Sequence, residues 1–338
     1  MGGPVDFSVF SIFDEFPDER PHRGSDRYTE ALELVQLADR LGYHTFWAAE
    51  HHFHPAGSLP APPVWLAAAS QVTRRIRLGS LVTVLPLHEP VALAEEFALL
   101  DRLSSGRLEI AMGTGNTPME YEGFGLDPET RRAVFPSRMD LFLKALRGEE
   151  VGSPRRKVRI NVLPVQRPTP PLWIAAGRRE AIRHVGRQGF SLAMIPYATV
   201  PDLSTLREEI REYRDALPPG IEPRVVAGYH IYAGADPKPA REALQRYLEQ
   251  RLFSQSAGYL ARVKEDPDLS SVDGLVRRGF VMMGSEEGIR RRIQDLEDCG
   301  VTEIAGIFDF GGLPFPRIRE SLERFARVAE IDGRAPIP

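Results

Sequence analysis

Strand and helix signals alternate along this chain almost throughout, and this alternation constrains the fold more than any other feature. Runs rich in β-branched and aromatic residues recur between longer segments whose apolar residues follow helical spacing. The first helix is predicted over Asp26–Gly42, with Asp26 as its N-cap. The eight predicted strands are Val5–Phe13, His44–Glu50, Ile76–Leu85, Leu108–Met112, Leu172–Ala176, Phe190–Ile195, Val225–Tyr232 and Glu303–Asp309. Eight strand–helix units favour an α/β fold of the TIM-barrel type, (β/α)8, over a doubly wound sheet.

The 338 residues are interpreted as one barrel domain over 1–338 with two irregular insertions. The first, at about 148–171, is rich in proline and arginine, and a short hairpin is expected around Val158–Val165, as an insertion or a lid. The second, at about 264–279, follows the helix predicted over Pro239–Val263. Neither has the size or the strand pattern of a further domain.

Charge and composition argue against several classes of protein. The net charge is −4, and the arginines are spread over predicted helices rather than gathered in one stripe, as a nucleic-acid surface would require. The apolar runs are too short for a bilayer span, and the first residues do not resemble a signal peptide. The single cysteine, Cys299, excludes an internal disulfide and is expected to be a buried thiol at a helix end. These features predict a cytoplasmic enzyme without nucleic-acid or membrane partners.

The stretch Phe46–His54, FWAAEHHFH, carries an ionisable cluster off the end of a predicted barrel strand. Since the carboxyl ends of barrel strands face the active site, Glu50 and His51 are candidate catalytic residues. Neighbours on an extended strand point to opposite sides, so His51 and His52 are expected to face different surroundings. One imidazole would be catalytic and the other supporting. The alternative is that the histidines only form a polar surface loop.

A metal site is a further alternative, with His51, His52, His54 and His88 as possible ligands. Mononuclear sites usually need three convergent ligands, and strand alternation would remove one of the adjacent pair. We therefore expect no metal ion. Nucleophilic serine chemistry is disfavoured as well, because the chain has no GxSxG elbow.

Two strand ends have the composition of a site for a planar, phosphorylated cofactor. Gly113–Asn116, GTGN, lets the backbone approach a ligand closely. Ala175–Gly177 runs directly into a helix start, whose free N–H groups and positive dipole end bind anions, and Arg178 or Arg179 can add a charge there. The alternative is that both arginines are ordinary exposed side chains on the surface of the helix and bind no ligand. The glycine spacing is not that of a dinucleotide fingerprint, so the motif does not predict bound NAD.

Six stretches of the sequence resemble the luciferase-like monooxygenases, the flavin-dependent family that includes bacterial luciferase. They are Leu41–Phe53, Ile76–Gly115, Glu122–Gly125, Pro170–Gly177, Gly284–Ile304 and Phe308–Pro314. The resemblance implies a β/α barrel, a flavin at the carboxyl ends of the strands and usually a homodimer. The apolar helices around Ala61–Ala69 and Val91–Leu100 are the expected contact faces.

The resemblance also assigns roles to single residues. His51 matches the active-site histidine of luciferase-type EHH motifs, and Leu81-Val82 match a non-proline cis peptide bond beside the flavin ring. Thr114 lies where relatives place an arginine toward the FMN phosphate, so Arg178 or Arg179 is expected to supply that charge. The residues expected to bind the cofactor are Leu81, Val82, Gly113, Thr114, Asn116, Ala176, Gly177, Arg178 and Arg179.

The function implied by the resemblance is a two-component monooxygenase. A separate reductase would supply reduced FMN, O2 would form a peroxyflavin in a dry pocket, and a small organic substrate would be oxygenated. His51 would act as general acid or base. Two alternatives stay open: hydride transfer with a reduced deazaflavin, and a non-catalytic flavin-binding barrel. The segment 264–279 corresponds to a substrate-side loop of luciferase and is shorter here, which argues against a luminescent aldehyde reaction.

Overall fold

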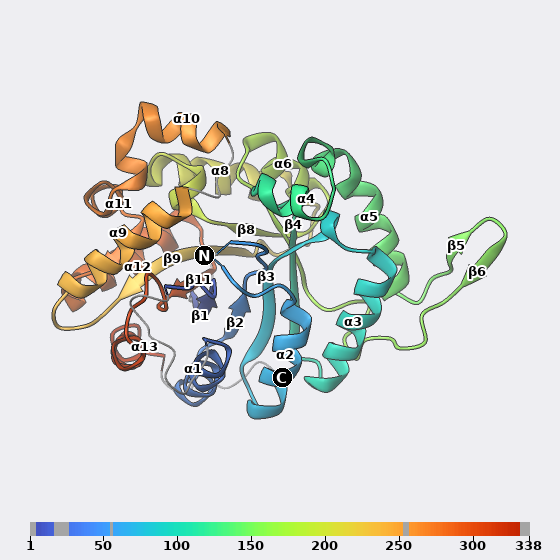
Figure 1. Ribbon diagram of the computed structural model, residues 1–338, viewed down its shortest axis with the longest axis horizontal. Helices are drawn as coiled ribbons and strands as arrows, with labels where there is room; N and C mark the ends of the chain where they lie inside the picture. The colour runs from blue at the N-terminus through green and yellow to red at the C-terminus, as the bar shows by residue number, and fades with distance from the viewer. Residues whose placement is uncertain (1–4, 17–26, 55–56, 253–256, 332–338) are drawn as a thin grey trace.

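The computed structural model describes residues 5–16, 27–54, 57–252 and 257–331. A closed barrel of eight parallel strands forms its centre, in the order β1-β2-β3-β4-β7-β8-β9-β11, and β11 pairs with β1 (Figure 1). The barrel strands are β1 (Asp6–Ser11), β2 (Thr45–Ala48), β3 (Arg77–Val84), β4 (Leu108–Gly113), β7 (Leu172–Ala175), β8 (Ser191–Met194), β9 (Val225–Tyr232) and β11 (Glu303–Ile307). The predicted TIM barrel is confirmed.

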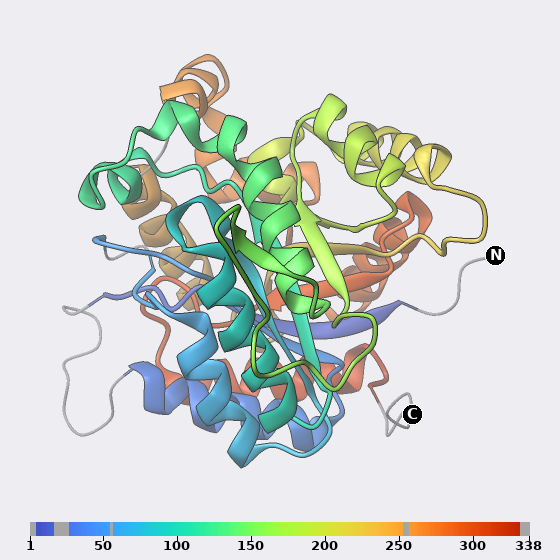
Figure 2. The same cartoon turned by 90° about the vertical axis from the view of Figure 1, so that its right-hand side faces the viewer.

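Helices surround the strands in both views (Figures 1 and 2). The longer helices are α1 (Arg27–Leu41), α2 (Pro62–Val72), α3 (Pro90–Leu103), α5 (Arg131–Leu146), α6 (Arg179–Arg187), α8 (Leu203–Ala216), α9 (Lys238–Leu252), α10 (Ala257–Glu265), α12 (Glu286–Cys299) and α13 (Phe315–Val328). The shorter ones are α4 (Pro118–Gly123), α7 (Pro196–Thr199), α11 (Val272–Arg278), η1 (Leu85–Leu87), η2 (Pro128–Thr130) and η3 (Pro267–Ser270). None of the helices in the described ranges has the length and apolar character needed to cross a bilayer.

Helix ends follow local sequence signals where these lie in the described part of the chain. Gly300 ends α12 in the left-handed conformation at φ 95°, as a glycine after the last helical turn can. Cys299 is buried at the end of that helix, as expected. Asp26, the predicted N-cap of the first helix, lies outside the described residues.

The prediction of an irregular insertion at 264–279 was wrong. The segment contains η3 and α11, and the short strand β10 (Val281–Met283) then pairs with β9. The segment buries Leu269, Val272 and Leu275, and Ser271 caps α11 by accepting an amide hydrogen. On its surface, Arg277 binds Asp268 at 2.7 Å. Helices this short have no long apolar stripe, so apolar periodicity does not reveal them.

The predicted hairpin lies earlier than expected. β5 (Val151–Ser153) and β6 (Arg156–Val158) form an antiparallel pair, whereas the sequence suggested Val158–Val165. Gly152 in β5 adopts φ 111°, and a Cβ there would lie 2.6 Å from a backbone oxygen of β6, so this strand pairing requires glycine at position 152. The hairpin projects outward beyond α3 and α5 (Figure 1).

Large side chains fill the amino-terminal half of the barrel. Trp47 of β2 and Trp173 of β7 meet edge to face across the interior, with centroids 5.7 Å apart. Gly79 makes room for them, because a Cβ there would lie 2.4 Å from the Trp47 ring. Each indole N–H donates to a buried carboxylate, Trp47 to Glu303 and Trp173 to Glu109. The large side chains therefore close this end of the barrel, and both indole N–H groups have hydrogen-bond acceptors.

Toward the carboxyl end, the same inward-facing rows continue with small residues. Because side chains alternate along a strand, Ala111 and Gly113 lie on the same face of β4 as Glu109, and Ala175 follows Trp173 on β7. Ala175 is exposed although it ends a strand inside a closed barrel. Ala111 and Gly113 are buried, so at this end the barrel is open to solvent at Ala175.

Candidate functional site

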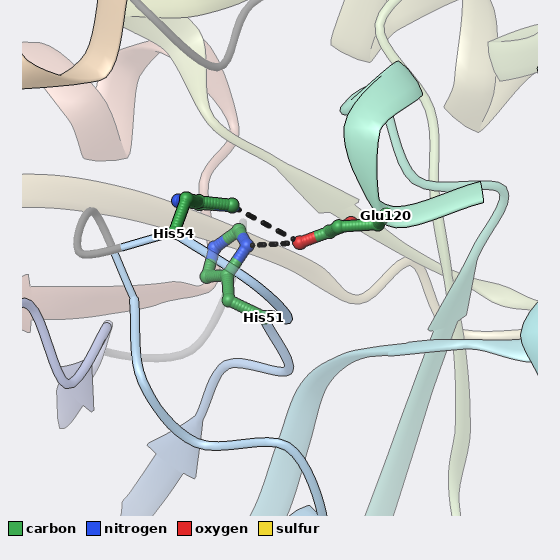
Figure 3. A group of neighbouring side chains, drawn as sticks. All are labelled: His51, His54 and Glu120. Carbon is green, nitrogen blue, oxygen red and sulfur yellow. Dashed lines mark hydrogen bonds and ion pairs between the residues drawn. The ribbon is translucent and has the colours of Figure 1, made fainter. Parts of the chain in front are cut away.

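His51 lies in the loop after β2, at the open end of the barrel. β2 ends at Ala48, two residues before the predicted strand end at Glu50, so both Glu50 and His51 lie in the loop. Nδ1 of His51 is 3.0 Å from Oε1 of Glu120 on α4, and the side chain keeps 26% of its surface exposed (Figure 3). Gly57 packs against the ring, where a Cβ would lie 2.3 Å from Cδ2. With Nδ1 held by Glu120, Nε2 is the nitrogen that can exchange a proton with a ligand.

One carboxylate oxygen of Glu120 accepts three hydrogen bonds. Oε1 accepts hydrogen bonds from the ring of His51, from Nε2 of His54 at 3.2 Å and from the backbone N–H of His52 at 3.1 Å (Figure 3). Burial raises the pKa of Glu120, but the hydrogen bonds from His51, His54 and the His52 amide, together with the charge of His51, lower it to about 2. The carboxylate is therefore ionised at neutral pH and keeps the hydrogen of His51 on Nδ1.

The carboxylate of Glu50 accepts hydrogen bonds from two other imidazoles and from a backbone amide. Its Oε1 accepts from Nε2 of His52 at 3.0 Å and from Nε2 of His88 at 2.8 Å, and its Oε2 accepts from the amide of Val84 at 3.0 Å. Burial raises the pKa of Glu50, yet the hydrogen bonds from the two imidazoles lower it below its ordinary value. Because both oxygens are engaged, the geometry gives Glu50 a positioning role between β2 and β3. His51 and His52 thus bind different carboxylates, as expected, although the strand has already ended.

The peptide bond between Leu81 and Val82 is cis, at the position that the resemblance implies. It lies in β3, where the register with β4 shifts between Ser80 and Thr83. Val82 faces Gly113 on β4, because a Cβ at Gly113 would lie 3.0 Å from its methyl carbon Cγ2. A larger residue at position 113 would therefore fill the space beside this bond.

The segment after β7 forms a tight turn into α6. Gly177 is required there, since a Cβ would lie 2.4 Å from a side chain of α7. Arg179 is directed toward α8, where its guanidinium binds Glu208 and Glu212 at 3.2 Å each. Arg179 therefore stabilises the packing of two outer helices. This geometry favours Arg178, the N-cap residue of α6, as the cation for a ligand at the turn.

Arg178 acts electrostatically on the start of α5. Burial and the positive charges of Arg178 and Arg131 lower the pKa of Arg132. Positive charge thus accumulates between the starts of α5 and α6, where an anion would be stabilised. At the end of β4, Thr114 is half-buried and its carbonyl accepts from the Tyr121 hydroxyl at 2.6 Å, while Asn116 is exposed.

Residues 5–303 match the family model described as luciferase-like monooxygenase. The chain belongs to the luciferase-like monooxygenase family. It is accordingly an enzyme of the oxidoreductase class. The uncharacterized protein y4wF of Sinorhizobium fredii is 32% identical over 322 residues, which cover 90% of this chain and 92% of that protein. The oxygenase component of the flavin-dependent trigonelline monooxygenase of Acinetobacter baylyi is 31% identical over 198 residues, 56% of this chain and 54% of that protein.

Solved structures of luciferase-like proteins share the fold over nearly the whole chain. Monooxygenase RslO1 of Streptomyces bottropensis is 25% identical, with a TM-score of 0.80 over 96% of this chain and 98% of that one. The oxygenating constituent of 3,6-diketocamphane monooxygenase of Pseudomonas putida, in complex with FMN, has a TM-score of 0.77 at 18% identity, covering 97% and 98%. An F420-dependent secondary alcohol dehydrogenase has a TM-score of 0.75 at 18% identity, covering 97% and 99%. These last two likenesses show the fold alone.

Sequence reasoning missed three residues of this luciferase-like site. Glu120 contacts His51 across 69 positions, and its only signal was its place just before the matching stretch Glu122–Gly125. His54 was considered only as a metal ligand. Arg132 looked like one of many helical arginines, and only the arrangement of α5 and α6 brings its charge near Arg178.

Proposed function

We propose that this luciferase-like monooxygenase is the oxygenase component of a two-component system that uses reduced FMN and O2 to oxygenate a small organic substrate. A separate reductase would supply the reduced FMN. The observation that carries the proposal is the His51–Glu120 pair at the open carboxyl end of the barrel, on the same rim as the Leu81-Val82 bond. The trigonelline relative, named as an oxygenase component, supports the division into two proteins.

The residues at the rim fit a flat, apolar ring. Gly113 and Ala175 keep space open beside Val82, and a single added Cβ at Gly113 would crowd it at 3.0 Å. Leu81 and Val82 would contact the ring from β3. The FMN complex of the 3,6-diketocamphane enzyme supports FMN as the group bound in this fold.

The phosphate of FMN would lie at the turn after β7. The amide of Gly177 and the start of α6 would provide donors and Arg178 would provide charge, whereas the amide of Ala176 already donates to the carbonyl of Ala193 at 3.2 Å. Arg132 at the start of α5 would add to that charge. Thr114 and Asn116, at the end of β4, complete the rim from the neighbouring strand.

When bound, reduced FMN supplies the electrons that activate O2. The chain's own part is to hold a proton at the reacting centre and to orient its donor. Glu120 keeps the hydrogen of His51 on Nδ1, so Nε2 faces the ligand as general base or, once protonated, as general acid. Such assistance is typically worth about 10²–10⁴-fold in rate. Glu50 fixes the loop by holding His52 and His88.

A homodimer is part of the proposal. α2 and α3 pack side by side and expose apolar side chains that a monomer would leave in water, among them Val64 at 72% and Leu99 at 51% exposure. Val72 and Leu103, on the same two helices, are also exposed. These side chains support α2 and α3, the helices named from the sequence, as the contact faces of the proposed dimer. The cytoplasmic location stays a prediction from the cysteine content.

Two other functions are possible outcomes of the experiments. Hydride transfer with a reduced deazaflavin is supported by the fold likeness to the F420-dependent alcohol dehydrogenase. A non-catalytic flavin-binding barrel would make His51 dispensable. The EHH sequence at Glu50–His52 favours FMN over a deazaflavin.

Incorporation of isotopically labelled O2 into a panel of candidate substrates tests the proposal, with reduced FMN supplied by a reductase. We expect His51→Ala to keep its affinity for reduced FMN and to lose about 10²–10⁴-fold in product formation. His184→Ala, on the exposed side of α6, is the matched control and should behave as wild type. Full product formation in His51→Ala would contradict the assignment.

A further inference from the structure

We propose that His51, His54 and Glu120 also form a binding site for one divalent transition-metal ion such as Zn²⁺ or Co²⁺. Nδ1 of His51, Nε2 of His54 and Oε1 of Glu120 all lie within 4.8 Å of one another (Figure 3). Two imidazole nitrogens and one carboxylate oxygen are a ligand set that Zn²⁺ and Co²⁺ accept in proteins.

Two of the three separations between these atoms match those around a single ion. Two ligands bound at about 2.0–2.1 Å in a tetrahedral arrangement are about 3.3 Å apart. Oε1 of Glu120 lies 3.0 Å from Nδ1 of His51 and 3.2 Å from Nε2 of His54. The carboxylate oxygen therefore already lies at a suitable distance from each imidazole nitrogen, and the two nitrogens lie within 4.8 Å of each other.

The three side chains converge from two parts of the chain that are also joined by a backbone hydrogen bond. His51 and His54 come from the loop after β2, with ring centroids 5.2 Å apart, and the backbone of His54 is bridged to Gly57. Glu120 comes from α4 and also accepts the backbone N–H of His52. Ligands held in this way lose little conformational entropy when they bind an ion.

The site has the form of one that keeps an open coordination position. The side chains of His54 and Glu120 are only 6% and 2% exposed, whereas that of His51 is 26% exposed at the barrel mouth. Three protein ligands with one accessible position are typical of zinc sites that take an exchangeable water or another small ligand.

The sequence argued against a metal here because strand alternation would separate the histidines. β2 ends at Ala48, before His51, so that objection does not apply. His52 and His88, two of the four ligands considered from the sequence, instead bind Glu50. The candidate ligand set is therefore His51, His54 and a glutamate from a distant helix.

A bound ion would replace the hydrogen bond between His51 and Glu120. If the proposed function holds, an ion at this site removes His51 from proton transfer, so Zn²⁺ would inhibit the enzyme and a chelator would restore it. The metal site itself does not depend on the flavin reaction.

Titration of the untagged full-length protein with Co²⁺, followed by visible absorption, tests the inference. We expect one Co²⁺ per chain with the intense bands of a four- or five-coordinate ion, and displacement by Zn²⁺, which binds more tightly in the usual order. His54→Ala and Glu120→Gln should each weaken Co²⁺ binding about tenfold or more, a loss that even outer-shell partners can cause. His184→Ala should bind Co²⁺ as wild type does. Circular dichroism shows that each variant is folded.

The inference fails if the folded wild-type protein binds no Co²⁺, or if His54→Ala and Glu120→Gln bind it as wild type does. Since Co²⁺ binding is read without flavin, the two proposals fail separately. A protein that binds Co²⁺ but not reduced FMN would keep the metal site and lose the proposed function, and the reverse result would do the opposite.

Discussion

Nδ1 of His51 lies 3.0 Å from Oε1 of Glu120, so an ionised carboxylate on α4 orients the imidazole that follows β2. The hydrogen bond joins two residues 69 positions apart. It determines which ring nitrogen of His51 is available at the barrel mouth.

Glu120→Gln is expected to lower product formation about tenfold, because a hydrogen bond to a charged group contributes roughly 1.5–3 kcal/mol and one to a neutral amide oxygen roughly 0.5–1.5 kcal/mol. The loss should appear in kcat rather than in the affinity for reduced FMN, since Glu120 is not among the residues proposed to hold the cofactor. Glu120→Asp, which keeps the charge, should recover part of the rate. Equal kcat values for wild type and Glu120→Gln would show that Glu120 does not position His51.

Arg178→Ala and Arg179→Ala form a matched pair on neighbouring positions. Loss of a charged donor to the phosphate should raise the Kd for reduced FMN about ten- to a hundredfold in Arg178→Ala. Arg179→Ala should leave this Kd near the wild-type value, because Arg179 binds Glu208 and Glu212 on the outside of the barrel. Anaerobic fluorescence titration measures both constants. A larger effect in Arg179→Ala would reverse the assignment.

His230 should make the fold sensitive to acid. It is fully buried among Tyr197, Tyr247 and Phe310, and both ring nitrogens are without hydrogen-bond partners among the described residues. Burial and the charge of Arg251 lower its pKa from 6.5 to about 3. The stabilising effect of the neutral ring is therefore complete above pH 6.5 and is lost as the pH falls toward 3.

Replacing this residue by phenylalanine removes the titration while keeping a ring in the aromatic cluster. Between pH 6.5 and pH 5, the free energy of unfolding of wild type should fall by roughly 1.5 kcal/mol more than that of His230→Phe. Urea unfolding at both pH values measures the difference. Parallel losses in the two proteins would mean that His230 is already protonated or accessible in the folded state.

The exposed apolar face on α2 and α3 should hold two chains together. Introducing charges with Val64→Glu and Leu99→Glu in one variant is expected to convert the dimer to a monomer, because the new carboxylates would be buried in the interface. Light scattering coupled to gel filtration measures the mass. Ile221→Glu, which alters an exposed apolar side chain outside these helices, is the control and should stay dimeric. A monomeric wild-type protein would remove this part of the proposal.

The barrel could be predicted from the sequence because each strand–helix unit has its own apolar period and the units repeat along the chain. An error in one unit does not change the predicted fold. The segment 264–279 shows the limit, since η3 and α11 each bury only a few apolar side chains, such as Leu269 and Leu275, which is too few to show a helical period. The hairpin was placed several residues too late, because β5 and β6 have three residues each and are mostly exposed, so no apolar pattern marks their bounds.

The site could be predicted only in part, because some of its residues are far apart in the sequence and meet only in the folded chain. His51 and the Leu81-Val82 bond lie in stretches that match the family, and the cis bond is where the match put it. Glu120 and Arg132 become important only through the packing of distant helices. The separate surroundings of His51 and His52 were expected from strand alternation, yet they arise from two carboxylates, Glu120 and Glu50.

Anaerobic titration of the wild-type protein with reduced FMN and with a reduced deazaflavin, followed by admission of O2, tests the central claim most directly. The account predicts tight binding of reduced FMN and product that forms only after O2 enters. Product formed from the deazaflavin without O2, or no affinity for either reduced flavin, would contradict it.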